Sequence, residues 1–191
     1  MSRSVILETI RKNRPAQSPL LEIRRQKEKD TQTNLALLFK ERLEQVGGQF
    51  IEITEKGAVE KFLLAEHPEA LDFSHAKIRK EFMKDYSLDK AYSVETIVLK
   101  GRIGVAENGA IWMEDTDFPV RLLPFVTQQL ILRLDSDQLV PTMYEAYQRI
   151  HPEEIGFGVF ISGPSKTADI EQSLVLGAHG AKELVVLFEN Y

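Results

Sequence analysis

Apolar residues recur along this chain with two different periods, and the alternation of the periods predicts an α/β fold. A helix is predicted over the stretch that ends at Gly47 and Gly48, because its apolar residues recur at helical spacing. Those residues are Leu35, Leu38, Phe39, Leu43 and Val46. The run that follows, 50–53, has the short, β-branched and aromatic character of a strand. A helix, a glycine stop and a strand together begin an α/β unit.

The same two periods continue to the end of the sequence. Helical spacing predicts further helices over 4–13, over 58–66, from about Ser74, and after Asp137. Short apolar runs predict strands at 97–99, 129–134, 157–161 and 184–188, and Asn108–Gly109 predicts a hairpin between 103–106 and 110–113. We expect the strands at 50–53, 129–134, 157–161 and 184–188 to share one mostly parallel sheet with helices on both faces. The predicted fold is a three-layer α/β/α sandwich.

The charge distribution separates residues 1–30 from the rest of the chain. The net charge is -5, yet residues 1–30 carry eight Lys/Arg against four Asp/Glu. We therefore predict a basic N-terminal helical arm with a linker over 1–30 and an α/β domain over 31–191. The arm is predicted to pack against another subunit or partner and could support a homo-oligomer; the alternative is a solvated helix and linker. Acidic overall composition, with no aromatic residues among the arm's charges, argues against nucleic-acid binding.

Several classes of chemistry are excluded by composition. The chain has no cysteine, so its own thiolates cannot form disulfides, bind zinc or ligate iron–sulfur clusters. His67, His75 and His151 are scattered without ligand spacing, so no metal site is expected. No Gly-x-Gly-x-x-Gly or Walker phosphate loop occurs. No apolar run approaches the roughly 20 residues of a membrane span, and no signal peptide is recognisable, so we expect a cytoplasmic location.

Candidate chemistry gathers in two loops near the C-terminus. Ser162–Ser165 follows the strand at 157–161 and precedes a predicted first helical turn, and Gly177–Gly180 forms a second corner. In open α/β sheets, ligands bind where loops leave the carboxyl ends of strands. Amides and hydroxyls at such a helix start can hold a phosphate or a carboxylate. The alternative is that both loops are ordinary turns and caps.

Ionisable residues in these loops and in one hairpin turn are the candidates for catalysis. Glu107 could act as a base, a nucleophile or a ligand, or could face water in a simple hairpin. His179 could be a general acid/base or could donate one structural hydrogen bond. Asp169 could orient His179 or bind a ligand hydroxyl, while Glu171 would complement the helix dipole.

We predict that Glu107, Asn108, Ser165, Asp169 and His179 line one pocket for a small anion or carboxylate. Glu107 and His179 are its catalytic candidates. The candidates for ligand binding are Asn108, Gly109, Ser162, Gly163, Ser165, Thr167, Asp169, Glu171 and Gly180.

The order of these residues resembles a known family. The run Ile161 to Glu171, followed by Gly177–Gly180, resembles the C-terminal signature of the LUD-domain family, of the lactate-utilisation protein C type. Val105–Gly109, Leu122–Pro124 and the helix ending in two glycines fall in the expected order, so the likeness spans essentially the whole chain. The resemblance implies an α/β/α sandwich of the NagB/RpiA/CoA-transferase type.

The resemblance also implies a role in oxidising L-lactate to pyruvate in bacteria. Companion proteins in such systems are thought to carry the iron–sulfur centres, so this chain would be an accessory or assembly subunit that binds no cofactor itself and has iron–sulfur partners. The alternative is an enzyme acting on a CoA ester or organic acid, because Glu107–Asn108–Gly109 is similar to the turn that carries the nucleophilic glutamate of CoA transferases. Asn108, Arg102 and Thr127 depart from the family pattern, so a different ligand is open.

Overall fold

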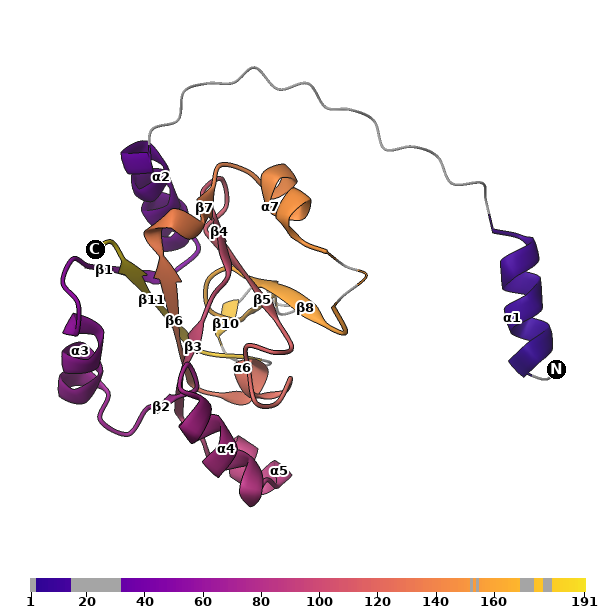
Figure 1. The fold of residues 1–191 in the computed structure, drawn as a ribbon, viewed down its shortest axis with the longest axis horizontal. Coiled ribbons are helices and arrows are strands. Elements are labelled where there is room, and N and C mark those ends of the chain that lie inside the picture. The colour runs from indigo at the N-terminus through magenta and orange to yellow at the C-terminus, as the bar shows by residue number, and fades with distance from the viewer. Residues whose placement is uncertain (1–2, 15–31, 152, 154, 169–173, 177–179) are drawn as a thin grey trace.

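The computed structural model describes residues 3–14, 32–151, 153, 155–168, 174–176 and 180–191 (Figure 1). Its helices are α1 (Arg3–Lys12), α2 (Gln32–Gln45), α3 (Ala58–Glu66), α4 (Ala76–Lys84), α5 (Leu88–Tyr92), α6 (Leu123–Val126) and α7 (Met143–Arg149), with a 3₁₀ turn η1 (Ser136–Gln138). Its strands are β1 (Gln49–Ile53), β2 (Leu71–Asp72), β3 (Thr96–Lys100), β4 (Ile103–Val105), β5 (Ala110–Glu114), β6 (Gln129–Asp135), β7 (Leu139–Val140), β8 (Gly158–Ile161), β9 (Lys166–Ala168), β10 (Leu174–Leu176) and β11 (Glu183–Glu189). No described helix is long and apolar enough to cross a membrane.

A five-stranded sheet in the order β1-β11-β6-β3-β2 forms the centre of the fold. All of its pairings are parallel, which confirms the α/β class and the mostly parallel sheet. The predicted strands at 50–53, 129–134 and 184–188 lie in it as β1, β6 and β11. We refer to the side where these strands end as the carboxyl edge and to the side where they begin as the amino edge.

The prediction that residues 157–161 join this sheet is wrong. They form β8, which pairs antiparallel with β5 in a second sheet of order β7-β4-β5-β8. Side-chain packing explains the choice: the ring of Trp112 on β5 lies 4.7 Å from the ring of Phe160. The Trp112 ring also covers Gly158, and a Cβ on Gly158 would lie 2.1 Å from the indole. The apolar strand is therefore half-buried against β5.

Packing differs on the two faces of the central sheet. On one face, α3 buries Val59 and Leu63 against Ile131 and its neighbours on β6, β3 and β11. The other face carries the largest core, where residues of α2 and the second sheet pack on the even-numbered leucines of β6. Figure 1 shows α3 to the left of the central sheet and β4, β5 and β8 to its right.

Two helix predictions need adjustment. The helix expected from about Ser74 is α4, which begins at Ala76 after His75. The first helical turn is predicted at Thr167–Glu171; Thr167 and Ala168 lie in β9, which pairs antiparallel with β10, and residues 169–171 lie outside the described residues. A β-branched residue at Thr167 favours this extended backbone.

Helix α1 exposes all of its side chains. Residues 3–14 are exposed throughout, including Val5, Ile6, Leu7 and Ile10 at 41–60%. Both the division of the chain into an arm and a domain and the partner of the arm stay predictions.

Candidate ligand pocket at the carboxyl edge

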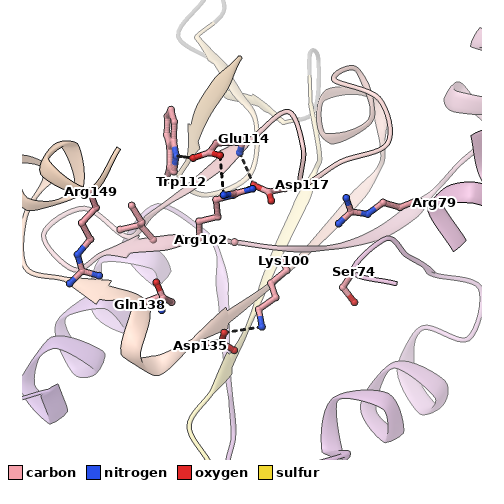
Figure 2. Close-up of a pocket in the computed structure, with 12 residues that line it drawn as sticks. Ser74, Arg79, Lys100, Arg102, Trp112, Glu114, Asp117, Asp135, Gln138 and Arg149 are labelled. Carbon is pink, nitrogen blue, oxygen red and sulfur yellow. Dashed lines mark hydrogen bonds and ion pairs between the residues drawn. The ribbon is translucent and has the colours of Figure 1, made fainter. Parts of the chain in front are cut away.

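A cavity of about 510 Å³ opens at the carboxyl edge, where β3 and β6 end (Figure 2). We call it the edge pocket. Open α/β sheets bind ligands at this edge, and the volume falls within the range of about 300–1,000 Å³ common for small-molecule sites. It is lined by Ser74, Arg79, Lys100, Gly101, Arg102, Ile103, Trp112, Glu114, Asp117, Asp135, Gln138 and Arg149.

Gly101 lets the chain pass from the central sheet to the second sheet at this point. Its amide donates to Arg133 O at 2.8 Å, and a Cβ there would lie 2.4 Å from Cγ2 of Ile111. A larger residue would force the two sheets apart. Arg102 follows directly, so the crossing places its side chain in the pocket.

Arg102 occupies the middle of the edge pocket and is held by acidic neighbours. Its Nε donates to Asp117 Oδ2 at 2.6 Å, and its Nη1 lies 3.0 Å from Glu114 Oε2. The hydrogen bond to Asp117 raises the pKa of Arg102 above its ordinary value. Glu114 also accepts from the indole Nε1 of Trp112 at 3.1 Å. These contacts fix the guanidinium, and the two carboxylates more than offset its positive charge.

Below Arg102, ion pairs join neighbouring strands of the central sheet. Lys100 Nζ lies 2.8 Å from Asp135 Oδ2, across β3 and β6. Deeper, Arg133 makes a two-fold contact with Glu189 through Nε at 2.7 Å and Nη2 at 3.0 Å. The same hydrogen bond raises the pKa of Arg133.

Glu189 is almost fully buried at the end of β11, with 5% of its surface exposed. Burial by itself would raise the pKa of Glu189, but hydrogen bonds from Arg133 and from the hydroxyl of Tyr191 outweigh it and hold that pKa below its ordinary value. Tyr191 donates at 2.5 Å. We call the ion pairs Lys100–Asp135 and Arg133–Glu189 the charged floor of the pocket; the groups of each pair satisfy one another.

Two cations at the pocket have no carboxylate partner among the described residues. Arg79 donates to the carbonyl oxygens of Phe73 and Thr116, each at 2.5 Å, so its side chain is held while its charge stays uncompensated. Arg149 ends α7, is exposed, and has no hydrogen-bond or ion-pair partner within the described part of the chain. Figure 2 shows Arg149 and Arg79 on opposite sides of the pocket with Arg102 between them.

The balance of charge favours an anionic ligand. The lining residues include four basic and three acidic side chains. Because the acids are engaged by Arg102 and Lys100, the free positive charge belongs to Arg79 and Arg149. Among the described residues, no group of His, Asp and Glu could hold a metal ion. The arrangement suits binding of a carboxylate or phosphate by charge-assisted hydrogen bonds.

The predicted candidate Glu107 lies outside this pocket. Its side chain is exposed, and its Oε1 accepts from the amide of Met143, the first residue of α7, at 2.6 Å. Thr142 and Glu145 form a capping box at the same helix start. Glu107 therefore satisfies a free amide of α7.

The predicted turn and the first predicted loop do lie together. Asn108 O accepts from the hydroxyl of Ser162 at 2.9 Å, and Asn108 Oδ1 accepts from the amide of Ala110 at 3.0 Å. Gly109 has a φ of +66°, and a Cβ there would lie 2.6 Å from the backbone nitrogen of Leu43. The turn is thus pressed against α2.

The second predicted loop meets the first at the amino edge. The Ser165 amide donates to Ala181 O at 2.8 Å, just before β11 begins, and Gly180 lies against the Ser165 side chain. The two loops therefore meet at one edge, but it is the amino edge of the central sheet, because Gly180 precedes β11 and Ser162 follows a strand of the second sheet. A smaller cavity of about 230 Å³ there includes Ser162, Gly163, Ser165 and Gly180 in its lining but not Glu107.

Asp169, Glu171 and His179 lie outside the described residues, as does the side chain of Thr167. Their roles, and those of the other predicted site residues, stay predictions. Thr127 is fully buried and donates to Glu95 O at 2.6 Å.

Sequence reasoning missed the cations of the edge pocket. Arg79, Arg102 and Arg149 come from α4, the β3–β4 crossing and α7, so no local motif joins them. One usable signal existed: Lys100–Gly101–Arg102 directly follows an apolar strand.

Family comparison supplies the identification. The model of the LUD domain matches residues 69–188, well over half of the chain. This chain belongs to the LUD-domain family. The matched region of this LUD domain begins just before β2 and includes every residue that lines the edge pocket.

Curated relatives and one solved structure agree with that assignment. Proteins named lactate utilization protein C from Geobacillus thermodenitrificans and Bacillus pumilus are 32% and 34% identical to this chain over 101 and 89 residues, covering 49% and 44% of it. The LUD domain spans 42% and 37% of those relatives' own lengths in these matches. An uncharacterized protein of Neisseria meningitidis is 29% identical over 82% of this chain and 68% of its own length. A crystal structure of a DUF162 family protein from Deinococcus radiodurans shares the fold, with a TM-score of 0.63, 15% identity, and coverage of 84% of this chain and 99% of that one.

Proposed function

We propose that this LUD domain acts in a lactate-utilisation system and that its edge pocket binds the carboxylate of a small organic acid. Relatives named lactate utilization protein C support the first part of the proposal. The observation that carries the second part is the pair of uncompensated cations, Arg79 and Arg149, at the carboxyl edge of a parallel sheet.

Within that system, we assign the domain an accessory or assembly role in the cytoplasm beside iron–sulfur partner proteins. The 191 residues contain no cysteine, so cluster ligation by thiolates would belong to the partners. The domain would contribute a pocket for the organic acid and surfaces for its partners.

The alternative role is an enzyme with a CoA-transferase-like glutamate. Its support is that Glu107 is exposed and lies on the turn that contacts Ser162. Its weakness is that the Glu107 carboxylate already accepts a hydrogen bond from the amide of Met143, and that Glu107 lines neither the edge pocket nor the smaller amino-edge cavity.

Growth on L-lactate tests the physiological part. A strain that lacks this gene is expected to grow poorly with L-lactate as sole carbon source and normally on glucose, and the wild-type gene should restore growth. Normal growth of the deletion strain on lactate would contradict the proposed function.

The same strain separates the accessory role from the enzyme. Glu107→Gln keeps an oxygen that can accept from Met143 but removes the nucleophilic carboxylate. Full rescue by this variant supports the accessory role, and loss of rescue by a folded variant supports the enzyme. Lys182→Gln, an exposed cation at the amino edge, is the matched control and should rescue fully.

A further inference from the structure

We propose that the edge pocket takes an extended organic dianion, with one acid group at Arg79 and the other at Arg149. The ligand class is a linear dicarboxylate or a phosphorylated carboxylic acid, whose shared chemistry is two anionic ends joined by a short chain. The inference deepens the proposed function, because it rests on the same pocket.

Arg79 offers a preorganised end for the ligand. Its Nε and Nη1 are fixed by the carbonyls of Phe73 and Thr116, and Nη2 has no partner among the described residues. Since carbonyl oxygens carry no net charge, the guanidinium keeps its attraction for an anion, and little side-chain entropy remains to be lost on binding.

Arg149 offers the opposite end. It is the last residue of α7, and it lines the pocket without any partner in the described part of the chain. The exposed end of a long side chain can reorient, so Arg149 can adapt to ligands of different length.

The surface between these two ends carries two basic and three acidic side chains, so it has one net negative charge. Arg102 is paired with Asp117 and Glu114, and Lys100 is paired with Asp135. A third anionic group there would compete with carboxylates that are already in place. Ile103 and Trp112 add apolar surface to this middle part, which suits a hydrocarbon chain.

Size argues in the same direction. A cavity of about 510 Å³ is of the class that holds drug-sized ligands, whereas lactate is far smaller and has one charge. Lactate could contact either cation but would leave the other uncompensated. A dianion can neutralise both.

Calorimetric titration of the full chain with defined probes tests the inference. The probes are succinate, glutarate and adipate, the monocarboxylates butyrate, valerate and caproate of matched length, L-lactate, and 3-phosphoglycerate. We expect the best dianion to bind at least about tenfold more tightly than its matched monocarboxylate and than lactate, with affinity falling as salt rises. The probe that binds best distinguishes a dicarboxylate from a phosphorylated acid as the class.

Two variants locate the ends of the ligand. Arg149→Gln should reduce dianion affinity to the level of the monocarboxylate without loss of fold, because Arg149 has no partner to lose among the described residues. Arg79→Gln should do the same where circular dichroism shows a native fold, and Lys182→Gln should change nothing. Equal affinity for dianions and monocarboxylates would overturn the inference, and so would a dianion affinity that is unchanged in Arg149→Gln.

Failure of this inference is distinguishable from failure of the proposed function. Growth on lactate requires no dianion binding, so a deletion strain that fails on lactate, with a protein that binds monocarboxylates alone, would leave the proposed function standing.

Discussion

The two edges of the central sheet are built from different residues for different purposes. At the carboxyl edge, strands end in charged residues: Lys100 pairs with Asp135, Glu189 pairs with Arg133, and other cations stay free toward a cavity. At the amino edge, Gly163 packs closely against Val46, which follows α2, and Gly180 packs closely against Ser165. The contrast shows that a loop rich in glycine and serine can result from close backbone packing alone. A candidate ligand site can instead consist of charged side chains that the fold brings together from separate elements.

The largest effect is expected from breaking the charged floor of the carboxyl edge. Arg133→Met leaves the buried carboxylate of Glu189 without its cation, and it removes the nearby positive charge from Asp72. We expect a loss of about 3–5 kcal/mol in the free energy of unfolding, measured by urea denaturation. The matched control is Lys84→Met, which removes an exposed ion pair with Glu81 and should cost less than about 1 kcal/mol. Similar costs for the two variants would show that the floor does not stabilise this edge.

An intermediate effect is expected where backbone packs on backbone beside the amino-edge loops. Gly109→Ala places a Cβ about 2.6 Å from the backbone of Leu43 in addition to the strain of a φ of +66°. Gly57→Ala has the same kind of strain, with a φ of +79°, but nothing within 4 Å. We expect Gly109→Ala to destabilise the protein by about 1–3 kcal/mol more than Gly57→Ala in the same denaturation assay. Equal losses would mean that the turn is not pressed against α2.

The pH dependence of stability is a finer probe of the carboxyl edge. Because the pKa of Glu189 is lowered in the folded protein, its ionised form contributes stability above the ordinary carboxyl pKa of about 4.3. That contribution is lost as the pH falls through the lowered pKa. We expect Glu189→Gln to be less stable than the wild type at neutral pH and to have a flatter acid limb between about pH 6 and pH 3. Parallel pH profiles for the two proteins would contradict the assignment.

The smallest effect on stability is expected from removing the arm. Residues 3–14 are exposed throughout, so deleting residues 1–19 should leave the urea midpoint of the domain unchanged. The same deletion should weaken association with a second copy or a partner, measured by sedimentation velocity and co-purification. If association is unchanged by the deletion, the arm does not contribute to binding a second copy or a partner.

Periodicity predicted most of the elements, because helices and strands depend on local apolar spacing. The helix over 58–66 is α3, and the hairpin around Asn108–Gly109 is β4–β5. The assignment of 157–161 to the wrong sheet had a non-local cause, since the fit of Trp112 over Gly158 involves residues far apart in sequence.

The edge pocket could not be predicted from local sequence patterns for the same reason. Its free cations come from α4 and α7, which the topology alone brings to one edge. The serine and glycine residues at 162–165 form a loop that contacts the Asn108 turn through the hydrogen bond from Ser162 to Asn108 O, while the shared pocket with His179 stays a prediction. Their sequence could not indicate the edge at which that loop lies, because the edge depends on which strands pair.

The most direct test of a carboxyl-edge ligand site is NMR titration of the ¹⁵N-labelled chain with adipate. The chain has one tryptophan, so a single indole N–H signal reports on Trp112 in the edge pocket, and the Gly101 amide reports beside it. Gly163 and Gly180 report on the amino-edge cavity. We predict saturable shifts of the Trp112 indole and Gly101 signals with Gly163 and Gly180 unmoved, and loss of the shifts in Arg149→Gln. Shifts confined to Gly163 and Gly180 would place the ligand at the amino edge and contradict this account.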